Sequence, residues 1–149
     1  MGQPHPSPDT ATDVARRLWE RAAGDDRVPE EVAAAAERIW AQLRAGLGRW
    51  IGVAGYRALL DRALGLARVK HPSLGGLSCL GEDGQETVTA VRAHGAGAVA
   101  AGLVAVVAAL IELLGRIIGV EMAVRLVEQI ALPSPRGVVR NESQGGRDG

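Results

Sequence analysis

The stretch that decides the fold reads Leu47-Gly48-Arg49-Trp50-Ile51-Gly52-Val53. It recurs 67 positions later as Leu114-Gly115-Arg116-Ile117-Ile118-Gly119-Val120, in which Ile117 replaces Trp50 and the other six residues are the same. A weaker match continues on both sides at the same offset, where Val32, Ile39, Leu43 and Leu59 fall on Val99, Val106, Leu110 and Leu126. Such self-similarity indicates two copies of one supersecondary unit, neither of which buries its apolar face alone.

Each copy predicts a helix, a glycine-containing corner and a second helix. In the first copy, Pro29 suits the start of a helix whose apolar residues recur on one face, and a second helix follows over about 53–69. In the second copy we expect one long helix from Gln85 or Glu86 to Arg116 and another over about 120–132. Short connections favour antiparallel hairpins over right-angle corners but do not decide between them. The corner residues are Gly48, Arg49, Gly52, Gly115, Arg116 and Gly119.

The predicted fold is therefore all-α. Units at about 30–69 and 86–132 form a four-helix core, and an N-terminal helix starting near Thr10 or Thr12 docks on it as an accessory. We expect a single helical domain over 10–132, with disordered tails at 1–9 and 133–149 because these are polar and rich in Pro, Gly or Ser. The connection 71–85 is apolar enough to be held against the bundle.

Composition narrows the function classes. The 149 residues include 17 basic and 17 acidic ones, so no global field attracts nucleic acid or an anionic membrane. The single cysteine, Cys79, forms no internal disulfide, and the first residues lack a secretory signal. These features predict a cytoplasmic protein.

One segment, Gly95–Ile111, contains 17 consecutive residues without a charge. A helix that is apolar all round lies either in the centre of a bundle or in a membrane. The run is shorter than the roughly 20 residues that cross a bilayer. The matching helix of the first copy carries Glu37, Arg38 and Arg44, which a membrane span would not. We therefore favour a central or oligomer-contacting helix over a span.

Few residues suggest a site for chemistry. Arg49 and Arg116 occupy matching positions, where they serve either as a paired anion site or, as we favour, as cations at helix C-termini. Glu112 has Arg116 as its expected partner one turn later. His71, Cys79 and Glu82 share a loop but lack the paired spacing of zinc ligands.

The remaining candidates are weaker still. His5 and His94 lack the spacing of helical metal ligands, and Ser78-Cys79 lacks the base that a nucleophile needs. The sequence predicts no catalytic residue, no metal and no cofactor.

The expected function is a non-enzymatic interaction or scaffold module that associates with itself, as a homo-oligomer, or with a partner protein. The second copy has more apolar residues than a small bundle needs to bury. The alternatives are a small membrane-associated protein that uses Gly95–Ile111, and a small DNA-binding regulator that touches phosphates through the helix 53–69. Neutral charge argues against nucleic-acid binding. The predicted interface residues are Ala98, Gly102, Ala105, Val107, Leu110, Met122 and Leu126.

Overall fold

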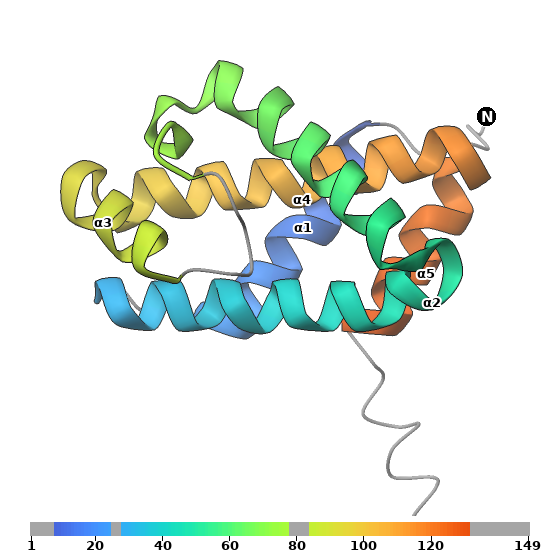
Figure 1. Cartoon of the computed structure of the whole chain (residues 1–149), viewed down its shortest axis with the longest axis horizontal. Coiled ribbons are helices and arrows are strands. Elements are labelled where there is room, and N and C mark those ends of the chain that lie inside the picture. Colours follow the sequence, from blue (N-terminus) through green and yellow to red (C-terminus); the bar gives the residue numbers. More distant parts are fainter. Residues whose placement is uncertain (1–7, 25–27, 78–83, 132–149) are drawn as a thin grey trace, which may run out of the picture.

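The computed structural model describes residues 8–24, 28–77 and 84–131 (Figure 1). Over these residues the chain forms only helices, which confirms the predicted all-α class. They are α1 (Pro8–Ala23), α2 (Pro29–Lys70), the 3-10 turn η1 (Pro72–Leu74), α3 (Gly84–His94), α4 (Ala96–Ile118) and α5 (Val120–Ala131). The two segments that we expect to be disordered fall almost entirely outside the described residues.

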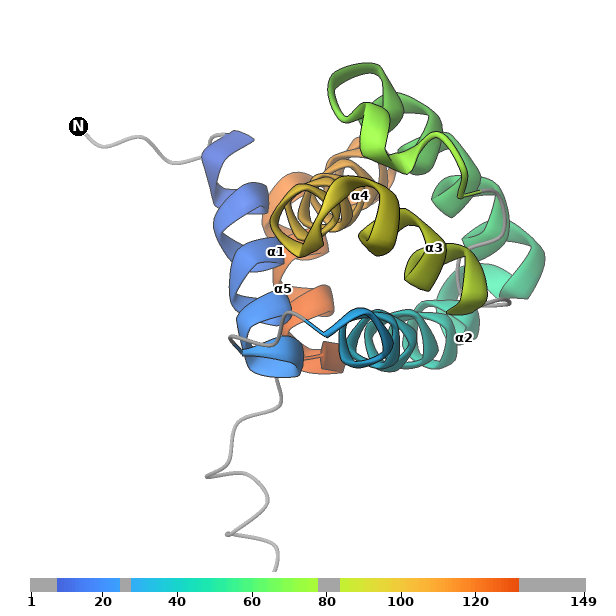
Figure 2. The ribbon, with the colours of Figure 1, turned by 90° about the vertical axis from the view of Figure 1, so that its left-hand side faces the viewer.

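Helix α4 is the centre of the bundle. It packs against α1, α2, α3 and α5, and Figure 2 shows the other helices arranged around it. Its buried side chains include Val99, Val106, Leu110 and Ile111, none of which is measurably exposed. A core of valine and leucine lets these helices approach one another closely.

Both glycine corners change the direction of the chain. Helix α2 runs on across residue 52, but the backbone of Gly52 has φ 83° and ψ 157°, so we distinguish a first arm (29–51) from a second arm (53–70). Gly119, between α4 and α5, has φ 95° and ψ 141°. Only glycine adopts this region readily.

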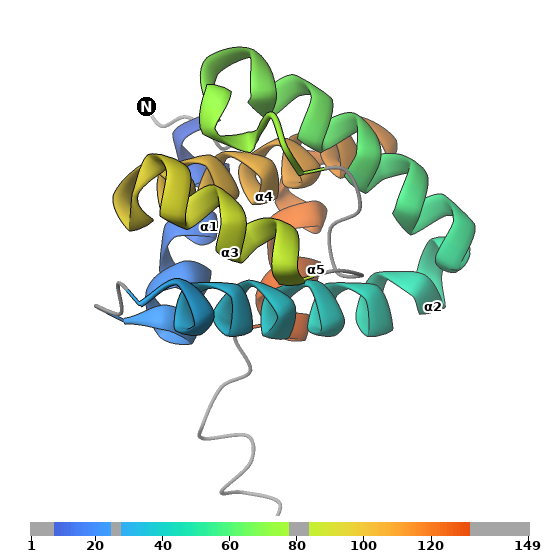
Figure 3. The same ribbon diagram turned by 60° about the vertical axis from the view of Figure 1, so that its left-hand side comes forward.

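The helices that follow the two corners diverge from the helices before them. In Figure 1 the first arm and α4 run in the same direction, and both corners lie at the same end of the bundle. Figure 3 shows the second arm rising from its corner away from the first arm, instead of lying along it as a hairpin would. Helix α5 turns toward the first arm, where a Cβ added to Gly46 would lie 2.5 Å from the Ile130 side chain.

Two expectations are wrong, one about the extent of a helix and one about the role of α1. The predicted single helix from residue 85 or 86 to 116 is broken at Gly95, whose φ is 95° and ψ 151°, so α3 and α4 are separate helices. Hydropathy changes at this position, because α3 carries Glu86, Arg92 and His94 whereas the charge-free run begins at Gly95, so the sequence did contain a signal of the break. Helix α1 is also more than an accessory, because Ala11, Val14 and Leu18 are buried in the common core.

The connection after α2 is held against the bundle over residues 71–77, as predicted. Leu74 and Leu77 are buried, and Leu74 fits over Gly102, where an added Cβ would come within 2.7 Å of it. The Arg68 guanidinium donates hydrogen bonds to the carbonyl oxygens of Leu74 and Leu77. The rest of this connection, including Cys79, lies outside the described residues.

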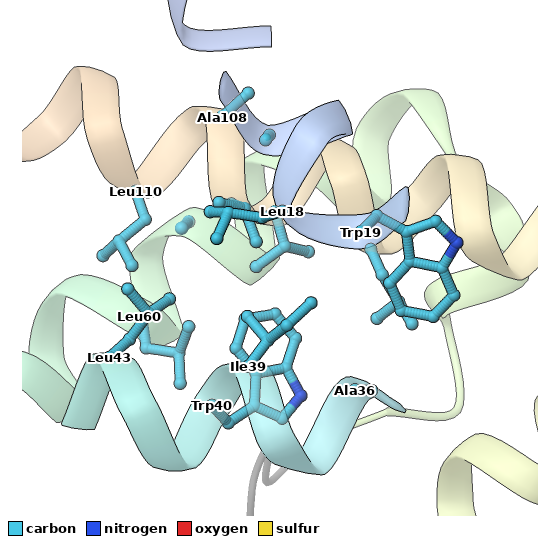
Figure 4. Packing of buried hydrophobic residues seen from close by; sticks show 14 of the residues in the cluster. Leu18, Trp19, Ala36, Ile39, Trp40, Leu43, Leu60, Ala108 and Leu110 are labelled. Atoms are coloured by element: carbon cyan, nitrogen blue, oxygen red, sulfur yellow. The ribbon is translucent and has the colours of Figure 1, made fainter. Parts of the chain in front are cut away.

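Side chains from α1, both arms of α2 and α4 meet in one cluster (Figure 4). Leu110 of α4 points toward Leu43 of the first arm and Leu60 of the second. Nearby, the Tyr56 hydroxyl donates a 3.4 Å hydrogen bond to the carbonyl oxygen of Trp40. Burial raises the pKa of the Tyr56 phenol well above its ordinary value, although the charge of Arg44 opposes the shift.

Candidate docking groove

One side of α4 faces solvent despite the apolar sequence of the helix. Ala101 is exposed, and Val104, Ala105 and Ala109 are half-buried. Their spacing of three or four residues places them on one face. Helix α1 and the second arm of α2 stand on either side, on opposite sides of α4 in Figure 2. Together the three helices enclose an open groove of about 690 Å³, a volume typical of binding sites.

The groove has an apolar floor and a polar rim. The floor consists of small side chains from α4, which leave room for a second backbone to come close. The rim combines residues from three helices, so the groove depends on the tertiary fold. Its lining residues are Thr12 and Arg16 of α1, Leu66, Ala67, Lys70 and His71 at the end of α2, and Ala101, Val104, Ala105, Ala108, Ala109, Glu112 and Arg116 of α4.

Positive charge predominates at the rim. Arg16, Lys70 and Arg116 line it together with a single carboxylate, that of Glu112. Arg16 lies 3.2 Å from Asp13, but both side chains are more than half exposed, so this pair contributes little to stability. The expected pairing of Glu112 with Arg116 is not present, since these two described residues form no ion pair.

The structure divides the predicted interface residues into two groups. Ala98 and Met122 are exposed, and Ala105 lies half-buried in the floor of the groove. Gly102, Val107, Leu110 and Leu126 are buried in the core of this chain, so they pack its own helices together and are not available to another molecule. A helix that is apolar all round does not show in its sequence which face is covered.

The repeated corners hold their arginines at the surface. Arg49 and Arg116 are both exposed, and Arg116 lies in the last turn of α4. Among the described residues that line the groove, Arg116 is present and Arg49 is not. Gly48 is half-buried, and Gly115 is buried where an added Cβ would lie 2.9 Å from Val120. The structure thus gives the two arginines different surroundings.

The sequence did not predict the basic rim, because its cations come from three separate segments of a chain whose net charge is zero. The stretch 38–70 contains seven basic residues and one acidic residue, whereas 8–37 contains eight acidic and four basic ones. Counting charge in windows along the chain reveals this segregation but not the rim, because Arg16 lies in the acidic stretch and Arg116 lies in neither. We expected no nucleic-acid binding because the net charge is zero. Nothing in the described residues tests this expectation, so it stays a prediction.

The two histidines among the described residues line different hollows. His71 belongs to the wall of the groove, and His94 lines a smaller hollow of about 310 Å³ together with Ser73, Gln85 and Glu86. Over 8–24, 28–77 and 84–131, no group of three His, Cys, Asp or Glu side chains is placed to hold a metal ion. His5, Ser78, Cys79 and Glu82 lie outside the described residues.

Comparison of the chain with protein-family models, with curated proteins and with solved structures gives no significant match. Helix α4 is long and apolar enough to cross a membrane, but 56% of its most apolar window is buried inside the protein. Burial of that kind is equally typical of the core helix of a soluble bundle.

Proposed function

We propose that this protein is a non-enzymatic helical interaction module that docks an amphipathic helix of a partner protein in the groove over α4. The observation that carries the proposal is the apolar character of an outward face. Val104, Ala105 and Ala109 occupy the positions that Glu37, Arg38 and Gln42 occupy in the first arm, at the same offset of 67 residues. A solvent-facing helix side ordinarily carries polar residues, and its replacement by alanine and valine is typical of a contact surface.

A helix is the occupant that the groove suits best. From Ala101 to Arg116 the floor follows α4 for about 22 Å, or roughly four helical turns. The small floor residues let a second backbone approach, and the 690 Å³ volume receives the side chains of one apolar face while the rest of the helix stays outside.

The proposal includes the equivalence of the two helix–corner–helix units. It is supported by the similar backbone angles of Gly52 and Gly119. It is also supported by a reversal of side-chain size. At the offset of 67 residues, Gly46 corresponds to the buried Leu113, and Ile130, which faces Gly46, corresponds to the buried Ala63. On this interpretation the groove lies where the second unit has apolar side chains at positions that are polar in the first.

The test uses a fluorescent helical peptide of roughly 15 residues with leucine and alanine on one face and glutamine elsewhere. We expect a saturable rise in anisotropy with the native protein. Ala105→Glu, in the floor, weakens binding at least about tenfold because it buries a charge against the apolar peptide. Ala41→Glu, at an exposed position of the first arm, is the matched control and leaves binding unchanged.

Absence of binding to the native protein, or equal binding by both variants, would refute the docking function. Circular dichroism and thermal melting of the two variants show whether each still folds. A Val107→Glu variant is unsuitable for this test, because Val107 is a core residue and a glutamate there unfolds the protein whatever its function.

Two related possibilities have specific support. A second copy of the chain is an alternative occupant of the same apolar face, and light scattering on a sizing column identifies it as a multiple of 15.5 kDa. A membrane-associated role is favoured by the length and composition of α4. Recovery of the protein only in detergent would support this membrane-associated role and count against our proposal that the protein is cytoplasmic.

A further inference from the structure

We infer that the partner helix is acidic, with carboxylates along the edges of its apolar face. This inference rests on the proposed docking function and adds the chemistry of the partner. It starts from the distribution of the rim cations, since Arg16, Lys70 and Arg116 come from three different helices and border one apolar floor. A helix lying on that floor has its polar edges beside these groups.

Two of the three groove cations, Lys70 and Arg116, differ from other cations of the protein in what they contact. Arg17 pairs with Glu128 of α5 at 2.9 Å, and Arg92 pairs with Glu30 of α2 at 2.6 Å, so these side chains link helices. Lys70 and Arg116 form no ion pair with any described residue, and both are exposed. Their charges are therefore available to an incoming molecule without breaking a contact of the fold.

Charge complementarity then specifies the occupant. Lys70 and Arg116 form no ion pair with a described residue, and Arg16 pairs only with the exposed Asp13, so the cations of the rim outnumber its one lining carboxylate, Glu112. A cationic or strongly hydrophobic neutral helix therefore gains less at the rim than an acidic one.

The described helices of a second copy meet the requirement poorly. The large apolar side chains that they expose include Trp50, Val69 and Ile117, which are next to the basic residues Arg49, Lys70 and Arg116 in the sequence and do not form the apolar face of an acidic helix. The partner is accordingly an acidic amphipathic helix of another protein.

Three peptides test the inference directly. They share the leucine and alanine face and carry glutamate, glutamine or lysine at the polar positions. We expect the glutamate peptide to bind most tightly and the lysine peptide most weakly, with added salt weakening only the glutamate peptide. Anisotropy titrations at low and at physiological ionic strength measure the three affinities.

The repeat supplies a matched pair of variants. Arg116→Glu and Arg49→Glu make the same change at the same place in a nearly identical heptapeptide, but only Arg116 lines the groove. Arg116→Glu weakens the glutamate peptide about tenfold, because a repulsion replaces an attraction at one edge. Arg49→Glu leaves this affinity within about twofold, since screening removes the effect of a distant exposed charge.

The possible failures are distinguishable. If the glutamine and lysine peptides bind as tightly as the glutamate peptide, the acidic partner is wrong and the docking groove stands. If none of the three peptides binds, both proposals fail. If phosphatidylglycerol vesicles bind the protein and Arg116→Glu abolishes that binding while no peptide binds, the occupant is an anionic lipid and the inference is overturned.

Discussion

The outward side of the first arm of α2 and the matching side of α4 precede the two copies of the repeated heptapeptide at the same offset of 67 residues, but they have opposite character. The first arm carries Glu37, Arg38 and Gln42 there, whereas α4 carries Val104, Ala105 and Ala109. Glu37 is half-buried near Gly84 of α3, and the Arg38 guanidinium donates a hydrogen bond to the carbonyl oxygen of Ala22, so of these three described residues only Gln42 is both exposed and without such a contact to α1 or α3. The inward sides of the two helices are alike, because Leu43 and Leu110 are both fully buried. The inward sides are constrained by packing within the chain, and the apolar outward side of α4 supports our proposal that this side contacts another molecule.

The largest effects test whether the two inward sides are equivalent. Leu43→Ala and Leu110→Ala each remove a fully buried side chain at matching positions. We expect each to lower the free energy of unfolding by about 2–5 kcal/mol, through lost burial and the cavity left behind. Urea unfolding followed by circular dichroism measures both, and a loss below about 1 kcal/mol in either variant would show that the two helices are not equivalent.

The corners come next in size. Gly52→Ala and Gly119→Ala place a Cβ on backbones with φ 83° and 95°, which costs about 1–3 kcal/mol at each position. Gly65→Ala is the control, because Gly65 is exposed within the second arm and has no atom near the added Cβ. This control stabilises the protein by roughly 0.5–1 kcal/mol through helix propensity. Thermal melting measures the three variants. A melting temperature of either corner variant as high as that of the control would contradict the corner geometry.

The contact of α5 with the first arm, between Ile130 and Gly46, can be tested by adding a methyl group. Gly46→Ala drives a methyl group into Ile130, and we expect a net loss of about 1–2 kcal/mol, smaller than overpacking alone because alanine favours helix. In an Ile130→Ala background the same change is stabilising, since the obstruction is gone. A double-mutant cycle measures this coupling, and purely additive effects would exclude the contact.

The smallest effect concerns Tyr56, whose counterpart in the second unit is Ala123. Burial raises the phenol pKa in the folded state, so the folded protein holds this proton more tightly than the unfolded chain. This contribution is fully present below pH 10, the ordinary pKa, and is lost as pH rises above it. We expect a loss of about 1 kcal/mol between pH 10 and pH 11 that is absent in Tyr56→Phe.

The measurement for this prediction is direct because Tyr56 is the only tyrosine. Phenolate absorbance of the folded protein reports its titration alone, and unfolding curves at each pH give the stability. Titration near pH 10 in the folded protein, or an identical pH dependence in Tyr56→Phe, would show that the phenol is not buried as described.

Both corners could be predicted from the sequence, because glycine lowers helix propensity and readily adopts the positive φ that a corner requires, and it recurs at the same places in both copies. Sequence reasoning missed the break at Gly95, where the polar stretch that ends at His94 meets the charge-free run, because apolar residues recur at helical spacing on both sides. It also could not divide α4 into covered and open faces, because α1 and the second arm of α2 determine which side stays open. The rim of the groove unites residues up to about a hundred positions apart, such as Arg16 and Arg116, which only the fold brings to one place.

The most direct test of the account is the accessibility of α4 in the isolated protein. In a Cys79→Ser background, Ala101→Cys places a thiol in the open floor and Val106→Cys places one in the core of the same helix. Maleimide labelling followed by mass spectrometry compares their rates. We predict that Cys at position 101 reacts within about threefold of a free thiol and at least about a hundredfold faster than Cys at position 106, which needs local unfolding to react. Equal protection of the two thiols in the isolated protein would contradict the account, because the outward side of α4 would then already be covered.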